Sequence, residues 1–166
     1  MEYQPGNKTA FHSFKLNEPM RSFLNHSLFL FVCAFANHAL AGELIINLGN
    51  QDKPGTLMLA IYNSAEAFAG SVSKEKRSEI GVFKGLELYL EPEDSTQLNT
   101  EIPDGEYAIA LFIDLNGNKK IDKNFLGIPK EQYGFSNNAM GKLSAPTFVQ
   151  AQFTVAGSTV QNINLK

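Results

Sequence analysis

The chain has 166 residues, of which 43% are hydrophobic and 19% are charged, and its formal net charge is −3 at pH 7. Proteins that bind nucleic acid gain much of their affinity by neutralising phosphates, so an acidic chain without a basic patch is not in that class. A single cysteine excludes a scaffold held together by disulfides.

Residues 1–41 have the pattern of an export signal. Arg21 precedes the nine-residue apolar run 28–36, and Ala39-Leu40-Ala41 has the small-x-small pattern of a cleavage site. The run is too short to span a bilayer as a helix, which needs about 20 residues. We therefore expect cleavage after Ala41 and a periplasmic or secreted mature chain with no membrane span.

Two details of this segment bear on its processing. Residues 1–19 form a long polar lead, and Met20 stands directly before Arg21, so we expect translation to start at Met20. Cys33 follows Val32, whereas a lipoprotein signal places a small residue before its cysteine. We therefore interpret Cys33 as part of the apolar run and not as a lipid attachment site.

Residues 42–166 are predicted to form a single domain. They contain 11 Lys and Arg and 15 Asp and Glu, a formal charge of 11 − 15 = −4, and no polybasic or amphipathic segment for an anionic membrane surface. All three histidines and the cysteine precede residue 42, and the chain has no tryptophan. The mature chain therefore lacks the residues for Ser-His-Asp or Cys-His catalysis, thiol redox chemistry and ordinary zinc sites.

Short apolar segments divided by turn residues make up most of the mature chain. We expect a hairpin with a longer loop from the first two of them, a helical turn from Ser64 to Phe68 with Ser64 as its N-cap, and a central strand from the nearly continuous apolar run 107–113. The expected strands are 44–48, 56–62, 86–90, 98–102, 107–113, 151–155 and 160–165.

This pattern of short strands with hardly any helix predicts an all-β fold. The expected architecture is an immunoglobulin-like or transthyretin-like β-sandwich of about seven strands. Residues 114–139 interrupt the strands and form one long end loop. Loops of more than about 12–15 residues are usually functional or disordered, and this one contains too many apolar residues to be disordered.

The first half of this loop has oxygen-bearing side chains at alternate positions, as a calcium site requires. With Asp114 as position one of an EF-hand-type loop, Asn116 falls at three and Asn118 at five. Lys120 then falls at seven, where its carbonyl would be the ligand, and Asp122 falls at nine. These five residues are the candidate metal ligands.

Two departures weaken this candidate site. Lys119 stands where the sharp turn prefers Gly, and Phe125 stands where a bidentate Glu should close the site. The one cofactor that the loop suggests is therefore weakly bound calcium, in about the millimolar class. The alternative is that the Asp and Asn side chains accept hydrogen bonds from backbone N–H groups in successive Asx turns, with no ion.

The second half of the loop mixes aromatic and amide side chains. Tyr133, Phe135, Asn137 and Asn138 are candidates for a surface that binds a glycan or a peptide. The alternative is that the asparagines satisfy backbone groups while the apolar side chains fold under the loop and anchor it to the sandwich. The anchoring side chains would be Phe125, Ile128, Tyr133 and Phe135.

A hydrolytic mechanism has little support in the sequence. Ser136 is the nucleophile that could be proposed, but without His or a G-x-S-x-G motif its base would have to be Lys130 or Lys142. A pair of catalytic carboxylates is not singled out by any pattern. No catalytic residue is assigned.

Several runs of this loop carry a family resemblance. They are Asp114-x-Asn-Gly-Asn, Ile121-Asp122, Asn124-Phe-Leu-Gly-Ile-Pro-Lys-Glu131 and Tyr133-Gly-Phe-Ser-Asn-Asn138, with looser matches at 55–62, at Phe68 and at 103–107. In these runs the chain resembles domain-of-unknown-function family 2141, small exported bacterial proteins. The resemblance implies an exported β-sandwich with no established activity, and a family that usually has Gly in place of Lys119.

The leading expectation is a non-enzymatic binding or accessory domain of the bacterial envelope that uses the 114–139 loop. Its partner would be an envelope protein or a glycan. The first alternative is a structural or assembly module in which the loop only braces the fold. The second is a hydrolase that uses carboxylates or a Ser/Lys pair.

Overall fold

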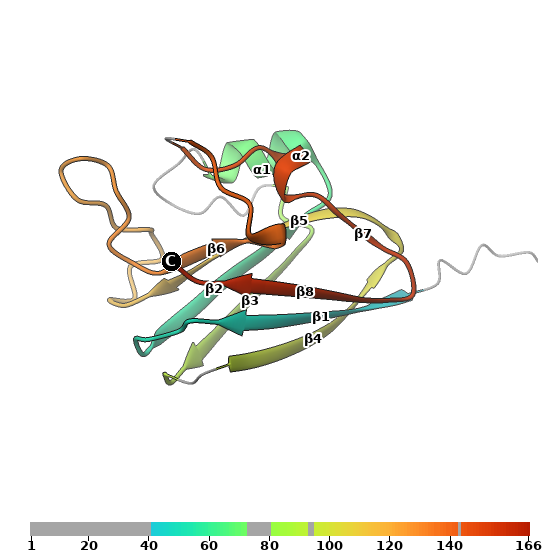
Figure 1. The fold of residues 1–166 in the computed structure, drawn as a ribbon, viewed down its shortest axis with the longest axis horizontal. Coiled ribbons are helices and arrows are strands. Elements are labelled where there is room, and N and C mark those ends of the chain that lie inside the picture. Colours follow the sequence, from blue (N-terminus) through green and yellow to red (C-terminus); the bar gives the residue numbers. More distant parts are fainter. Residues whose placement is uncertain (1–40, 73–80, 93–94, 143) are drawn as a thin grey trace, which may run out of the picture. The chain divides into compact units, whose positions relative to one another are not determined.

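The computed structural model describes residues 41–72, 81–92, 95–142 and 144–166 (Figure 1). The predicted export signal, with its start at Met20, lies outside these residues. Ala41, the last residue before the predicted cleavage point, is the first residue of the first strand.

The described residues form eight strands in two sheets, with three short helices. The strands are β1 (Ala41–Gly49), β2 (Gly55–Tyr62), β3 (Lys84–Leu90), β4 (Ser95–Pro103), β5 (Gly105–Asp114), β6 (Tyr133–Phe135), β7 (Phe153–Val155) and β8 (Ser158–Asn164). The helices are α1 (Ala65–Val72), the 3₁₀ helix η1 (Ser136–Asn138) and α2 (Phe148–Ala151).

The two sheets differ in size and in strand direction. The three-stranded sheet has the order β4-β1-β8, in which β1 is antiparallel to β4 and parallel to β8. The five-stranded sheet has the order β3-β2-β5-β6, with β7 also pairing with β5, and all its pairs are antiparallel. The prediction of an all-β sandwich is confirmed, and its immunoglobulin-like or transthyretin-like subtype stays a prediction.

The main core lies between the sheets. Alternate residues of each strand point inward, as the two-residue period of a strand requires. Leu44 of β1, Leu57 of β2 and Ile109 of β5 are fully buried there. Each such side chain stabilises the fold by about 1.5–3 kcal/mol relative to an exposed position.

A second apolar layer covers part of the outer face of the five-stranded sheet. Outward-facing Tyr62 of β2 contacts Phe68 of α1 at a ring-centroid distance of 5.6 Å, and Phe68 contacts Phe135 of β6 at 6.2 Å. Ala108 of β5 and Ala151 of α2 belong to the same buried cluster. Because β5 is buried on both faces, its sequence is nearly continuously apolar, and its prediction as a central strand is confirmed.

The predicted hairpin of the first two strands is wrong, because β1 and β2 lie in different sheets. The turn between them crosses from one sheet to the other, and its backbone groups are satisfied by a distant side chain. Gln132 accepts a hydrogen bond from the Asp52 N–H at 3.0 Å and donates one to the Asn50 carbonyl at 2.7 Å. Sequence spacing alone does not reveal a partner so far along the chain.

Smaller differences concern the helices and the last strands. The Ser64 cap is confirmed by its hydrogen bond from the Ala67 N–H, although α1 continues beyond Phe68 to Val72. The expected strand 151–155 begins only at Phe153, because Thr147 starts the short helix α2 with a capping box. In the described parts of the chain, no helix has the length and apolar character needed to cross a membrane.

Candidate functional site

The 114–139 loop connects β5 to β6 and η1 at the end of the sandwich where the C-terminus lies (Figure 1). We call residues 114–122 and 131–138 the loop root, and residues 123–130 the loop tip. The backbone of Tyr133 in the root exchanges two hydrogen bonds with Lys166, the last residue, at 3.0 and 3.2 Å. The root is therefore tied to the sheet at both ends.

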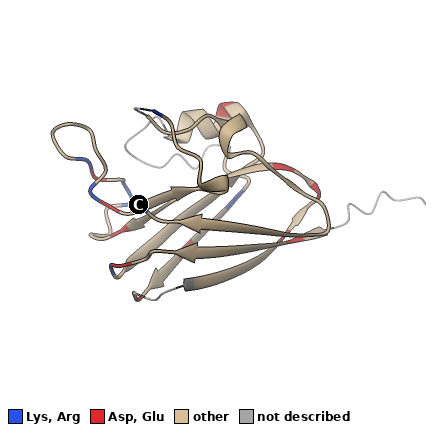
Figure 2. Cartoon of the chain, in the orientation of Figure 1, with Lys and Arg blue, Asp and Glu red and all other residues tan. Residues whose placement is uncertain are grey.

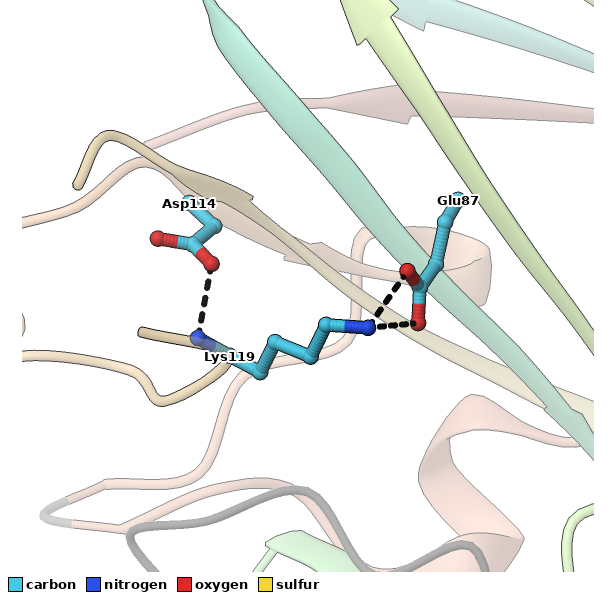
Figure 3. Close-up of polar contacts among 3 residues, drawn as sticks. All are labelled: Glu87, Asp114 and Lys119. Atoms are coloured by element: carbon cyan, nitrogen blue, oxygen red, sulfur yellow. Dashed lines mark hydrogen bonds and ion pairs between the residues drawn. The ribbon is translucent and has the colours of Figure 1, made fainter. Parts of the chain in front are cut away.

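Asp114 organises the first half of the root. Its carboxylate is 3% exposed and accepts three backbone hydrogen bonds. The N–H groups of Asn116 and Gly117 donate to Oδ1 at 3.2 and 2.8 Å, and that of Lys119 donates to Oδ2 at 2.8 Å (Figure 3). A carboxylate with this many backbone donors fixes the turn without any other partner.

The two asparagines continue the same pattern. Asn116 Oδ1 accepts from the Asn118 N–H at 3.1 Å, and Asn118 Oδ1 accepts from the Lys120 N–H at 2.7 Å. Their amide nitrogens donate in turn to the two carboxylate oxygens of Asp122, at 2.7 and 3.2 Å. Each of these side chains is therefore engaged in successive Asx turns.

Glu131 completes the root, and the sequence analysis assigned it no role. It is 3% exposed, its Oε1 accepts from the Leu115 N–H at 3.0 Å and its Oε2 accepts from the Asp122 N–H at 2.9 Å. It thereby joins both ends of the root. In the sequence it stands in the polar run Lys130-Glu131-Gln132 directly before β6, and no pattern there distinguishes it from a solvent-exposed residue.

The side-chain oxygens of the candidate ligands in the root accept hydrogen bonds from N–H groups of the same segment. Within the described residues, no three His, Cys, Asp or Glu side chains gather so that they could hold a metal ion. Calcium binding by Asp114, Asn116, Asn118, Lys120 and Asp122 stays a prediction of the sequence.

Lys119 links the root to the edge of the five-stranded sheet. Its backbone has φ of 58°, in the left-handed region that favours glycine. Its ammonium group forms an ion pair with Glu87 of β3 at 2.9 Å (Figure 3). The lysine therefore combines a strained backbone with a surface ion pair.

The side chains of Asn137 and Asn138, in the second half of the root, also form hydrogen bonds with backbone groups. Asn137 and Asn138 both have positive φ, 58° and 50°. Asn137 donates to the Gln152 carbonyl at 2.7 Å, whereas Asn138 donates to the Asn162 carbonyl at 2.9 Å. Asn138 Oδ1 also accepts from the Asn164 N–H at 2.8 Å. These contacts tie η1 to Gln152, which lies between α2 and β7, and to β8.

Ser136 lies between the two apolar layers. It is fully buried, and its hydroxyl accepts from the Ile109 N–H at 2.9 Å and donates to the Ala151 carbonyl. A hydroxyl engaged in both directions joins β5 to α2. This contact gives Ser136 a structural role and does not present it to a substrate.

An apolar groove of about 720 Å³ opens beside the loop, on the outer face of the five-stranded sheet. Its floor is formed by outward-facing side chains of β2 and β5, including Met58, Ala110 and Phe112. Tyr133 and Phe135 extend this floor along β6. The structure thus brings the two predicted aromatic residues to the groove and turns the two predicted amides away to backbone.

The walls of the groove come from two segments. The loop tip contributes Leu126 and Ile128, and the other wall contains Met140, Gly141, Lys142, Ser144 and Ala145. Gly141 allows this second wall to turn tightly, because an added Cβ would clash with the Ser144 carbonyl oxygen. Two lysines, Lys123 and Lys142, also line the groove.

A comparison with protein families gives one match. A family described as an uncharacterized protein conserved in bacteria, domain of unknown function 2141, matches residues 46–164. The chain belongs to this family, as the resemblance in the loop indicated. No curated protein and no solved structure matches the chain.

Proposed function

We propose that this member of domain-of-unknown-function family 2141 is a non-enzymatic binding domain of the bacterial envelope. Its ligand occupies the groove between the 114–139 loop and the outer face of the five-stranded sheet. The ligand has an apolar body, such as an acyl chain, and an acidic end. The observation that carries this proposal is the groove itself, with an apolar floor and two lysines in its lining.

The dimensions and chemistry of the groove support a small ligand. Ligand sites usually have about 300–1,000 Å³, are lined mostly by apolar and aromatic side chains, and contain a few polar groups that fix orientation. Met58, Phe112 and Tyr133 supply apolar and aromatic surface. Lys123 and Lys142 are both exposed, so either ammonium group can meet a carboxylate or phosphate at the groove mouth.

The loop root supports this proposal by holding one wall of the groove in place. Asp114 and Glu131 fix the backbone on both sides of the loop tip through five backbone hydrogen bonds. A wall that is ordered before binding loses less conformational entropy when the ligand enters. Under this proposal, the candidate metal ligands of the root hold the loop in place and do not contact the ligand of the groove.

Export to the periplasm or the medium is part of the proposal. Its support is the sequence pattern of residues 1–41, with a basic residue, an apolar run and a small-x-small site. An apolar groove that binds lipid-like ligands suits a protein of the periplasm, which lies between two membranes. N-terminal sequencing of the protein from a bacterial periplasmic fraction tests it, with Gly42 as the expected first residue.

Binding of cis-parinaric acid, a fluorescent fatty acid, tests the groove. Ala110→Phe places a ring on the groove floor and is expected to weaken binding at least about tenfold, which corresponds to 1.4 kcal/mol. Lys142→Gln removes a charge from the lining and is expected to weaken it about fivefold. Ala156→Phe, at an exposed position in the β7–β8 turn, is the matched control and should leave binding unchanged.

No binding of parinaric acid by the natural chain, or equal binding by Ala110→Phe and Ala156→Phe, contradicts the proposal. Thermal unfolding of each variant shows whether a loss of binding comes from loss of the fold. Because the chain has no tryptophan, the protein does not interfere with parinaric acid fluorescence through that residue.

A second candidate function is a structural or assembly module whose loop only braces the fold. The observation that favours it is that the root side chains form hydrogen bonds with backbone groups and with one another. This candidate predicts co-purification with one envelope protein and no small-ligand binding. Ala110→Phe would then have no effect on any interaction.

A further inference from the structure

The loop tip is a small hairpin in which several backbone groups are paired internally. Lys123 and Pro129 form a β-bridge, and the Asn124 N–H donates to the Ile128 carbonyl at 2.8 Å. The Gly127 N–H donates to the Asn124 carbonyl at 2.9 Å, with Gly127 at φ of 78°. Asn124 Oδ1 accepts from the N–H groups of Leu126 and Ile128 at 2.9 and 3.0 Å.

This hairpin presents apolar side chains to solvent. Phe125 is 95% exposed, Leu126 is 68% exposed and Ile128 is 55% exposed. The alternative that Phe125 and Ile128 fold under the loop as anchors is therefore wrong, although Tyr133 and Phe135 do pack there. A contiguous exposed apolar group on a projecting loop marks an interaction site.

Two exposed lysines stand at the two ends of this tip. Neither Lys123 nor Lys130 forms an ion pair with another described residue. The nearby carboxylates of Asp114 and Glu131 are buried and turned to backbone N–H groups, and that of Asp122 accepts from the side-chain amides of Asn116 and Asn118. Figure 2 shows the loop without charged residues at its far end and with both basic and acidic positions nearer its base.

We propose that the loop tip docks the protein on an anionic lipid bilayer. Phe125 and Leu126 enter the boundary between headgroups and acyl chains, and Lys123 and Lys130 contact headgroup phosphates. Unpaired backbone groups are costly in a bilayer, and the N–H groups of Leu126, Gly127 and Ile128 are paired within the tip. A projecting tip with exposed apolar side chains and two exposed lysines fits a deformable anionic surface.

The proposed docking site is a short hairpin and not one of the usual membrane-binding segments. The chain shows no polybasic run and no basic amphipathic helix, and its mature part has an acidic balance. A hairpin of eight residues instead gathers a few apolar and basic side chains at one place. One such contact gives weak and reversible membrane binding. The inference does not depend on a ligand in the groove.

Tryptophan fluorescence tests the docking, because the natural chain has no tryptophan. Phe125→Trp in the full chain places a single reporter at the tip. Its emission is expected to shift to the blue with vesicles of equimolar phosphatidylcholine and phosphatidylglycerol, and to be quenched by acyl-brominated lipid. Val149→Trp is the matched control, since Val149 is 77% exposed on α2, and its emission should not change.

The lysines provide a second test with its own control. In the Phe125→Trp background, Lys130→Gln is expected to weaken vesicle binding about fivefold, and so is an increase in salt. Lys142→Gln, which removes a lysine of the groove, should leave vesicle binding unchanged. The groove gives the opposite pattern, because Lys142→Gln and not Lys130→Gln weakens parinaric acid binding. Failure of one proposal is therefore distinguishable from failure of the other.

Three results would overturn the docking proposal. In the first, the emission of Phe125→Trp stays unchanged at saturating vesicle concentration. In the second, the emission shift is the same with pure phosphatidylcholine as with the anionic vesicles, and Lys130→Gln leaves it unchanged. In the third, vesicles have no effect but a purified, lipid-free envelope protein shifts the emission, which assigns the tip to a protein pocket.

Discussion

The root and the tip of the 114–139 loop use their side chains in opposite ways. In the root, Asp114 and Glu131 are buried and their oxygens accept backbone N–H groups. In the tip, Phe125 and Leu126 are exposed, while Asn124 accepts from two backbone N–H groups. The polar half therefore builds structure, and the apolar half is available for binding.

This contrast reverses the ordinary expectation for a loop. Polar side chains on a loop usually suggest recognition, and apolar ones usually suggest anchoring. Here the polar side chains accept hydrogen bonds from the backbone N–H groups of a long segment. Buried N–H groups must be paired, and this segment has no neighbouring strand along most of its length to pair with. Exposed apolar side chains contribute little to stability, so those of the tip point to an interaction with a partner.

The largest expected effect comes from two phenylalanines of the same loop. Phe135→Ala removes a buried ring that contacts Phe68 and is expected to lower the free energy of unfolding by about 3 kcal/mol. Phe125→Ala removes an exposed ring and is expected to change it by less than about 0.5 kcal/mol. Urea unfolding measures both, and similar losses in the two variants would break the comparison.

The next largest effect concerns the carboxylates of the root. Asp114→Ala leaves three backbone N–H groups without their acceptor and is expected to cost about 2–3 kcal/mol. Asp122→Ala is the matched control, because Asp122 accepts from two exposed side-chain amides, and it should cost less than about 1 kcal/mol. Equal losses in urea unfolding would show that Asp114 does not organise the root.

A smaller expected effect on stability distinguishes the backbone strain at Lys119 from its ion pair. Lys119→Ala removes the ion pair with Glu87 and keeps the left-handed backbone, whereas Lys119→Gly removes the ion pair and relieves the backbone. The glycine variant is expected to be more stable than the alanine variant by about 1 kcal/mol. Thermal unfolding compares them, and a more stable alanine variant would contradict the positive φ.

The smallest expected effect is that of calcium on the root. If the sequence prediction of a millimolar site holds, about 10 mM Ca²⁺ after EDTA treatment stabilises the fold by about 1.4 kcal/mol. If the side chains of the root only cap backbone groups, the change stays under about 0.3 kcal/mol, and this is the result we expect. The larger shift would show that the amides reorient and would restore the ion site.

Much of the fold could be predicted from the sequence, because strands have a simple period. Alternation located most strands, and the continuous apolar run 107–113 identified β5 as a central strand. The pairing of β1 was not predictable, because its partners β4 and β8 lie far along the chain. The strand β6 was missed, since three residues are too few to show a period.

The sequence located the site, but it did not reveal the roles of the residues in it. Residue types marked the 114–139 loop as unusual, yet they do not reveal which atoms a carboxylate or amide faces. Asn137 and Asn138 suggested recognition and instead tie η1 to backbone carbonyls. Phe125 suggested an anchor and is instead exposed. Burial decides both roles, and burial depends on contacts between distant segments.

Backbone chemical shifts during a titration with decanoate test the division between root and tip most directly. The account predicts that the amide signals of Leu126, Ile128 and Tyr133 move as the ligand enters the groove. The amide signals of Gly117 and Lys119 in the root should stay in place. Movement confined to the root, or no movement at all, would contradict the claim that the polar half builds the loop and the apolar half binds.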